Sequence, residues 1–426
     1  MKTCAFRTLG CKVNQYETQA MRELFTSAGY REVSFRSPSE VYVINTCTVT
    51  AKTDREGRYL IRQANRTNPR GRVIVTGCYT ELDEEKIRSI PGVSLIVKNR
   101  DKARIIQMLE PGAEGTKDPE TGYTALSVSD FKGHTKAYLK VQDGCDNFCS
   151  YCKVPLARGR SRSRSPESAV EEMKRLVDKG FKEIILTGIC LGAWGGDFKP
   201  GRRLIDLLRP LASVEGDFRI RLSSVEPKYV DEALTAFIRS SPKICRHLHV
   251  PLQSGDDDVL RMMNRPYTAD GFRAMIASAR KTLPEVSITT DALVGFPGES
   301  DSAFDNTCRL LEDILPSRIH VFPYSRREGT AASLYKDGPP FDAVRRRLEK
   351  IRSLASSSSF SYRKRFLNRA TGVLIETERD RSTGLLKGYD DKYIKVVLSG
   401  PDSYMSSITP VRIERVEKDC TIGAAI

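Results

Sequence analysis

Short buried-strand patterns alternate with amphipathic helical patterns over the first hundred residues of the chain. Apolar runs bounded by polar stretches are typical of parallel strands that are buried on both faces. Such runs occupy residues 5–9, 41–44, 73–75 and 95–97. Between them, apolar positions at three- and four-residue spacing predict helices, for example at 18–28 and 52–64. This alternation predicts an α/β, flavodoxin-like doubly wound domain, which we place at residues 1–125.

The same alternation resumes at residue 136 and predicts a second α/β domain over residues 135–365. Predicted strands lie at 137–141, 183–187, 218–223, 247–252, 286–293 and 318–322. Predicted helices lie at 168–179, 204–213, 229–239, 269–282 and 302–311, and a basic helical segment follows at 341–365. Six strand–helix units predict a partial (βα)6 barrel, with functional residues on the loops that follow the strands.

The last part of the chain has a different pattern. Residues 366–426 contain short strand-like runs, at 371–376, 393–398 and 411–416, which Gly, Asp and Pro interrupt. This pattern predicts a small β-barrel of a kind that often binds RNA. Residues 110–134 are rich in Gly and Pro and have little apolar periodicity, so we expect a linker or an irregular crossover there.

Composition and charge narrow the function classes. With 39% hydrophobic and 29% charged residues, the chain has the composition of a soluble globular protein. It contains no apolar run near the ~18 residues of a membrane span, and its first residues lack a secretory signal, so we expect a cytoplasmic protein without a membrane partner. Eleven cysteines in that compartment favour metal ligands and free thiols over disulfides. The net charge of +15 favours an anionic partner such as nucleic acid.

Three cysteines form a compact motif just after the first strand of the second domain. Cys145, Cys149 and Cys152 have the spacing C-x3-C-x2-C. Three thiolates can hold three irons of a four-iron cluster, and no fourth cysteine follows, so one iron would stay open to a ligand. The alternative is a structural zinc site, but zinc favours paired C-x2-C elements that close four ligands, and no second pair exists.

Three further cysteines share one topological position in the first domain. Cys11, Cys47 and Cys78 each follow a predicted strand. Because the carboxyl ends of parallel strands meet at one edge of a sheet, these thiols are expected to converge. Buried cysteines can also act as small hydrophobic residues. Three matching positions favour the ligand interpretation, and with it a second three-cysteine cluster site.

Two basic stretches are candidate RNA contacts. The helix after Cys47 carries five basic residues mostly on one face, Lys52, Arg55, Arg58, Arg62 and Arg66. Such a face is either simply solvated or in contact with RNA. Residues 153–165 contain no acidic residue and four arginines, Arg158, Arg160, Arg162 and Arg164. This stretch is either a disordered tract or a basic lip for phosphates, and its place beside the cysteine motif favours the lip.

The motif 144–152, including Tyr151 before the last cysteine, resembles the cluster loop of radical S-adenosylmethionine (radical SAM) enzymes. With both cysteine triads and the stretch 249–255 (His-Val-Pro-Leu-Gln-Ser-Gly), the whole chain resembles the radical SAM methylthiotransferases. The last ~60 residues look like the C-terminal TRAM barrel of that family, which is a less specific match.

This resemblance implies a set of cofactors, partners and site residues. The cofactors are two [4Fe-4S] clusters, held by the two triads, and S-adenosylmethionine. The partners are the anticodon stem-loop of a tRNA, an electron donor such as flavodoxin or ferredoxin, and a sulfur donor. Residues implied to contact S-adenosylmethionine lie on loops at strand ends, namely Thr187, Gly188, Ser223, Glu226, Gln253, Val294 and Gly295.

Two segments point to one branch of the family. Residues 9–18 (LGCKVNQYET) and 45–50 (NTCTVT) look most like the members that methylthiolate threonylcarbamoyladenosine beside the tRNA anticodon. Other members act on isopentenyladenosine or on a ribosomal protein aspartate, and they stay as alternatives. So does a non-catalytic iron–sulfur protein that binds RNA. Cys190 departs from the family pattern and has no assigned role.

Overall fold

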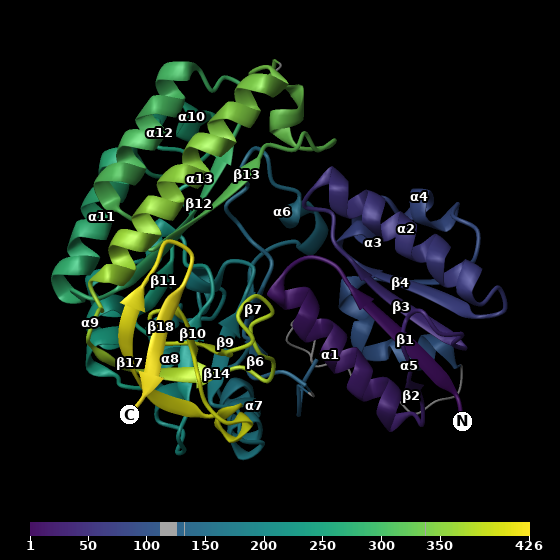
Figure 1. Ribbon diagram of the computed structural model, residues 1–426. Coiled ribbons are helices and arrows are strands. Elements are labelled where there is room, and N and C mark those ends of the chain that lie inside the picture. Colours follow the sequence, from purple (N-terminus) through teal and green to yellow (C-terminus); the bar gives the residue numbers. More distant parts are fainter. Residues whose placement is uncertain (111–125, 132, 337) are drawn as a thin grey trace.

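The computed structural model describes residues 1–110, 126–131, 133–336 and 338–426, and Figure 1 shows their arrangement. The first domain contains a five-stranded parallel sheet in the order β2-β1-β3-β4-β5, the flavodoxin-like order. Its strands are β1 (Thr3–Thr8), β2 (Arg31–Glu32), β3 (Val41–Thr46), β4 (Arg72–Gly77) and β5 (Val93–Val97). Its helices are α1 (Lys12–Ser27), α2 (Ala51–Thr67), α3 (Cys78–Leu82), α4 (Glu84–Arg88), η1 (Asn99–Arg104) and α5 (Ile105–Leu109).

Alternate residues of this sheet are buried on opposite faces, as strand geometry requires. On one face, Tyr42 and Ile44 pack with Ile61 of α2. On the other face, Val41 and Val43 pack with Phe25 of α1. Helix α1 has a second buried side, where Tyr16 and Ala20 join the core of the second domain. The first domain is therefore docked on its neighbour through α1.

The second domain is a half-open barrel of six parallel strands. Two three-stranded sheets, β6-β9-β10 and β11-β12-β13, are joined by isolated bridges, among them Ser224–His249. Its strands are β6 (Ala137–Lys140), β9 (Glu183–Thr187), β10 (Arg219–Leu222), β11 (His247–His249), β12 (Ser287–Val294) and β13 (Arg318–Pro323). Its longer helices are α7 (Pro166–Asp178), α8 (Leu204–Ala212), α9 (Glu232–Ser240), α10 (Asp257–Met262), α11 (Ala269–Thr282), α12 (Asp301–Ile314) and α13 (Phe341–Lys364).

Short elements complete this domain around the cysteine motif. They are β7 (Gln142–Asp143), α6 (Val154–Arg158), β8 (Arg162–Ser163), η2 (Leu191–Ala193), η3 (Pro227–Tyr229) and η4 (Ala331–Leu334). Leu126, Val128 and Phe131 also pack in the barrel core, so part of the expected linker is structural, while residues 111–125 and 132 lie outside the described residues.

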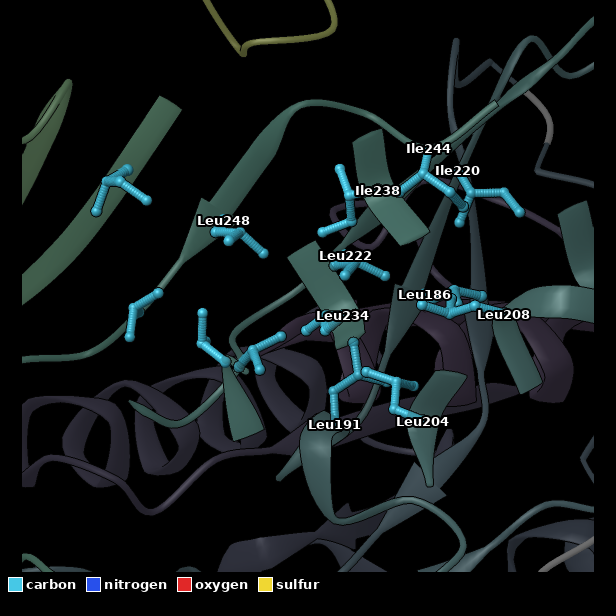
Figure 2. Close-up of a cluster of buried hydrophobic side chains, with 14 of the residues drawn as sticks. Leu186, Leu191, Leu204, Leu208, Ile220, Leu222, Leu234, Ile238, Ile244 and Leu248 are labelled. Carbon is cyan, nitrogen blue, oxygen red and sulfur yellow. The ribbon is translucent and has the colours of Figure 1, made fainter. Parts of the chain in front are cut away.

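The strands of the half-barrel have an apolar outer side and a polar inner side. Leu186 lies near Leu208 and Leu222 near Leu234, both leucines of the covering helices, and Ile220 belongs to the same apolar cluster (Figure 2). The residues between them are polar, for example Arg219 and Arg221 on β10 and His247 and His249 on β11. Because successive residues of a strand face opposite sides, these polar side chains line the inside of the half-barrel.

The C-terminal segment forms a closed barrel in the order β14-β15-β16-β18-β17. Its elements are β14 (Ala370–Ile375), β15 (Leu386–Tyr389), β16 (Lys395–Leu398), η5 (Asp402–Tyr404), β17 (Ile408–Val416) and β18 (Thr421–Ala425). Arg219 and Arg221, both paired with Glu183, donate hydrogen bonds to backbone oxygens of this barrel, including Tyr389 and Asp390. Polar groups inside the half-barrel thus hold the C-terminal barrel in place. Within the described residues, no helix is both long and apolar enough to span a lipid bilayer.

Candidate active site with two cysteine triads

The first triad lies at the carboxyl edge of the N-terminal sheet. Cys11 caps α1 directly after β1, Cys47 follows β3, and Cys78 begins α3 after β4. These three strands are neighbours in the sheet, so their ends bring the thiols together. Burial raises the pKa of the Cys47 thiol to about 11, and the nearby Cys78 and Cys11 add to that rise. Cys11 itself is exposed.

Two glycines make this convergence possible. Gly10 and Gly77 have φ angles of +93° and +101°, which side chains rarely adopt. A Cβ atom at Gly10 would lie 2.6 Å from Cβ and 2.8 Å from Sγ of Cys47. A Cβ atom at Gly77 would lie 2.2 Å from the carbonyl oxygen of Thr46. Neither position has room for a side chain while the triad keeps its geometry.

The second triad lies on the loop that follows β7. Cys145, Cys149 and Cys152 are all half-buried. Backbone N–H groups donate to two of the sulfurs, from Asn147 to Cys145 at 3.5 Å and from Val154 to Cys152 at 3.4 Å. Burial raises the pKa of Cys152 to about 12, and the proximity of Cys149 and Cys145 adds to it. Hydrogen bonds to the sulfurs are a feature that tunes iron–sulfur sites.

Each triad has one arginine that donates a hydrogen bond to a cysteine sulfur. Arg265, just after α10, donates to Cys149 at 3.2 Å and is also paired with Glu226. Arg158, at the end of α6, donates to Cys78 at 3.3 Å. The loop that carries the second triad therefore continues directly into a residue that contacts the first. Sequence reasoning missed Arg265, because no motif surrounds it.

Arg158 is the centre of a buried ion network between the two domains. Its guanidinium donates to Glu17 at 2.9 Å and to Asp143 at 3.0 Å. Lys140 donates to both carboxylates at 2.7 Å, and Lys102 pairs with Glu17. Burial by itself would raise the pKa of both acids. The three cations instead hold the pKa of Glu17 well below its ordinary value, and Arg158 and Lys140 lower that of Asp143 to about 2.

The network places positive charge beside Cys78. Three cations, Arg158, Lys102 and Lys140, face two carboxylates, Glu17 and Asp143. Burial raises the pKa of the Cys78 thiol, whereas Arg158 and Lys102 lower it. Arg158, which donates to the Cys78 sulfur, therefore partly offsets the cost of forming a thiolate there, the form of cysteine that binds metals.

These contacts show that the prediction of a basic lip for phosphates was wrong for most of the four arginines. Arg158 and Arg164 are buried, and Arg164 pairs with Glu172 at 2.9 Å, so neither can meet a phosphate. Arg162 is half-buried and bonds the carbonyl of Arg158. Arg160 alone of these four arginines is exposed, and it pairs with Asp146. The absence of nearby acidic residues in the sequence was misleading, because Glu17 and Asp143 come from other elements.

The expected S-adenosylmethionine contacts lie at the carboxyl ends of the half-barrel strands. Thr187 ends β9 and Gly188 follows it, Ser223 follows β10, and Glu226 contacts Arg265. The buried Oγ atom of Ser223 has no hydrogen-bond partner among the described residues, so it can accept a ligand. Gln253 has a φ angle of +68°, in the strained left-handed region.

In the loop after β12, the two expected contact residues, Val294 and Gly295, pack within the protein. The N–H of Gly295 donates to Glu299 at 2.7 Å, and a Cβ atom there would lie 2.8 Å from Val344 of α13. Gly295 thus packs against α13, and Val294 before it is fully buried. These two residues shape the loop after β12, while the free hydroxyl of Ser223 follows β10, on the other side of β11.

Cys190 lies beside the second triad. Its backbone N–H donates to Gln142 at 2.8 Å, and Asn147 donates to its sulfur at 3.7 Å. A hydrogen bond from the Cys190 thiol lowers the pKa of Cys145 to about 7.

The donor sets agree with iron–sulfur clusters. In the described part of the chain, no group of three or more His, Cys, Asp or Glu side chains is arranged to hold one metal ion. A four-iron cluster instead distributes its cysteine ligands over separate irons. The arginine and backbone donors at the sulfurs agree with that kind of cofactor.

Comparison with known proteins identifies the family. Residues 139–311 match the model of the radical SAM superfamily, and residues 3–98 match the uncharacterized protein family UPF0004. The threonylcarbamoyladenosine tRNA methylthiotransferase MtaB of Bacillus subtilis is 39% identical over 97% of this chain and 94% of its own length. The chain belongs to the radical SAM methylthiotransferase family. As a radical SAM methylthiotransferase it uses [4Fe-4S] clusters and S-adenosylmethionine.

Other relatives agree with this assignment. The MtaB protein of Thermotoga maritima is 38% identical over 99% of this chain and 97% of its own length. The tRNA-2-methylthio-N(6)-dimethylallyladenosine synthase of Desulfitobacterium hafniense is 30% identical over 95% of this chain and 93% of its own length. The radical S-adenosylmethionine methyltransferase TsrM from Kitasatospora setae has a similar fold, with a TM-score of 0.59 at 15% identity, over 78% of this chain and 77% of TsrM.

One substitution tests the crowded turn at the first triad. Gly10→Ala should displace Cys47, so iron content after anaerobic reconstitution should fall by about half, from about eight to about four per chain. Gly29→Ala is the matched control, because Gly29 also has a positive φ, of +81°, but no atom lies within 4 Å of its Cβ position. Full iron content in Gly10→Ala protein would show that Cys47 is not a ligand.

Proposed function

We propose that this methylthiotransferase converts threonylcarbamoyladenosine beside the tRNA anticodon into its 2-methylthio derivative. The observation that carries this proposal is the near full-length similarity to MtaB proteins, at 38–39% identity in the two relatives described above. Their printed names specify threonylcarbamoyladenosine in tRNA. The dimethylallyladenosine relative is less similar, at 30% identity.

The chemistry of the substrate explains the need for two sites. Carbon 2 of adenine carries an aromatic C–H without an acidic proton, so acid–base groups cannot activate it. A reduced [4Fe-4S] cluster with S-adenosylmethionine supplies the radical chemistry for that bond, while the protein supplies binding and orientation. Cys145, Cys149 and Cys152 would hold three irons and leave the fourth for S-adenosylmethionine. Cys11, Cys47 and Cys78 would hold the second cluster, from which the sulfur group is delivered.

Residues around the second triad would bind the amino-acid part of S-adenosylmethionine. Ser223 offers a free hydroxyl, Thr187 ends the adjacent strand, and Gly188 follows it. Glu226 is positioned by Arg265, which also contacts Cys149. Gln253 follows β11. Val294 ends β12 and Gly295 follows it, at the same end of the half-barrel. Arg265 itself would stabilise the negative charge of the cluster sulfurs.

The RNA contacts would lie outside these buried networks. The C-terminal barrel (residues 366–426) is one candidate surface, and the domains at 1–125 and 135–365 would enclose the modified base. On α2, Lys52, Arg55, Arg62 and Arg66 are exposed and could meet phosphates of the anticodon stem-loop. We further infer a cytoplasmic enzyme that receives electrons from flavodoxin or ferredoxin and sulfur from a separate donor.

Nucleoside analysis of cells that lack this protein tests the substrate. We expect mass spectrometry of their tRNA to show threonylcarbamoyladenosine in place of its 2-methylthio form. Wild-type protein should restore the methylthio form, and Cys149→Ala protein should not. Loss of 2-methylthio-isopentenyladenosine instead, or an unchanged nucleoside profile, would contradict the proposed substrate.

A further inference from the structure

A cavity of about 370 Å³ lies where the three parts of the molecule meet. Its lining includes Lys12 at the start of α1, Tyr138 on β6 and Ile185 on β9. The C-terminal barrel contributes Tyr389 and Tyr393, whose rings lie 5.0 Å apart. The start of α1, the strand β6 and the C-terminal barrel lie side by side in Figure 1. The cavity therefore exists only when all three parts are assembled.

Most charged groups in the cavity wall are already paired. Lys136 pairs with Glu376 at 3.4 Å and lies 4.2 Å from the centre of the Tyr389 ring. Lys387 pairs with Glu376 at 3.7 Å and with Glu378 at 4.0 Å. These contacts neutralise the two carboxylates at the rim of the cavity, so they do not repel an anion strongly.

Lys12 is the exception. Its ammonium forms no hydrogen bond or ion pair with any described residue. The carboxylate of Glu183 is near, but Arg219 and Arg221 engage it at 2.7 and 2.8 Å, and Arg221 and Lys136 add positive potential around Lys12. Lys12 also occupies the first turn of α1, where unpaired backbone N–H groups favour negative charge. The Lys12 end of the cavity is therefore positively charged and suited to bind an anion.

The position of Lys12 connects this site to the reaction. Lys12 directly follows Cys11, a proposed ligand of the second cluster. An anion bound to Lys12 would therefore be held next to the group that delivers sulfur. Lys136 and Arg221 lie over the rings of Tyr389 and Tyr393, at 4.2 and 4.5 Å from the ring centres, and add positive charge to this wall of the cavity. The cavity therefore fits a negatively charged substituent of a base that is held at the reaction site.

We propose that Lys12 binds the carboxylate of the threonylcarbamoyl group and that this cavity selects the substrate. The inference rests on the proposed function, because the threonyl part of that group carries a carboxylate. An isopentenyl group has no charge, and it would leave the Lys12 ammonium without a partner. A buried polar group that is left unpaired is the usual basis for rejecting an analogue. A charge-assisted contact of this kind should favour the correct RNA by about 10- to 100-fold.

Binding of three anticodon stem-loop RNAs of one sequence tests the inference, with fluorescence anisotropy of the reconstituted protein as the measurement. The RNAs carry threonylcarbamoyladenosine, its carboxyl methyl ester, or unmodified adenosine. We expect wild-type protein to bind the first RNA about 10- to 100-fold more tightly than the other two. Lys12→Gln should remove that preference without weakening the binding of unmodified RNA. Lys12→Arg should keep part of it.

Lys52→Gln is the matched control, since Lys52 is an exposed lysine of the same domain. It should weaken all three RNAs equally, if at all. The inference is overturned if Lys12→Gln keeps the wild-type preference or weakens all three RNAs equally. Equal binding of the acid and its methyl ester by wild-type protein also overturns it, whatever the folding of the variants. Failure of the proposed function is a separate result, in which wild-type protein forms no methylthio product on the first RNA.

Discussion

Replacing Arg158 with alanine is expected to lower the free energy of unfolding by about 3–5 kcal/mol. The guanidinium is fully buried and is shared by Glu17, Asp143, Asn14 and Cys78. Its removal leaves two buried carboxylates with two lysines, and it deprives Asn14 and Cys78 of a donor. Breaking a buried ion network by removing one partner is costly because the remaining charges stay desolvated.

Urea denaturation followed by circular dichroism measures this effect. Arg160→Ala is the control, because Arg160 is two residues away and forms an exposed pair with Asp146, with side-chain exposures of 77% and 47%. Exposed pairs contribute about 0–1 kcal/mol. Arg158→Lys should fall between the two, since it restores the charge without the planar fork. If Arg158→Ala were no more destabilising than Arg160→Ala, the network would not hold the domains together.

The repeating strands and helices could be predicted because their burial is regular. The predicted strand 183–187 and helix 269–282 coincide with β9 and α11. Helix α1 begins at Lys12, six residues before the predicted start. Its first turns contain Asn14 and Glu17, which are polar but buried. Polar residues that are buried through distant partners look like surface residues in a sequence.

The C-terminal barrel shows a second limit of prediction from the sequence pattern. The strands β15 and β18 were not predicted, and each contains a glycine, Gly388 and Gly423. A Cβ atom at Gly388 would lie 2.3 Å from the carbonyl of Leu374 on the adjacent strand. Glycine here permits close strand packing, although in sequence it resembles a turn signal.

The part of the candidate site that could be predicted is the part whose residues follow neighbouring strands of one sheet. The cysteines Cys11, Cys47 and Cys78 could be grouped because each follows a strand of one parallel sheet. The contacts of Arg158 and Arg265 could not be predicted, because their partners lie on elements far away in the sequence. Charge patterning alone assigned Arg158 and Arg164 to the surface, and burial shows that this assignment was wrong.

Single cysteine substitutions are expected to separate the cleavage of S-adenosylmethionine from the formation of the methylthio product. Cys11→Ala should keep the iron of the second triad, because Cys145, Cys149 and Cys152 are held on a different domain. It should therefore still cleave S-adenosylmethionine to 5′-deoxyadenosine but form no methylthio product. Cys149→Ala should abolish both activities, since it removes a ligand of the cluster that binds S-adenosylmethionine.

Cys308→Ala is the matched control for these variants. Cys308 is a buried core cysteine of α12 and lies in the apolar cluster of the half-barrel. Its truncation should cost some stability, as cavity-forming substitutions do, and leave both products unchanged. Iron content, measured in parallel, should fall by about half in each of the two ligand variants and stay at about eight irons per chain in the control.

The most direct test of two cooperating cluster sites is the simultaneous measurement of both products by mass spectrometry. Reconstituted protein is incubated with S-adenosylmethionine, a reductant and stem-loop RNA that carries threonylcarbamoyladenosine. Wild-type protein should form 5′-deoxyadenosine and the 2-methylthio nucleoside, whereas Cys11→Ala protein should form 5′-deoxyadenosine alone. Normal formation of the methylthio nucleoside by Cys11→Ala protein would contradict the account.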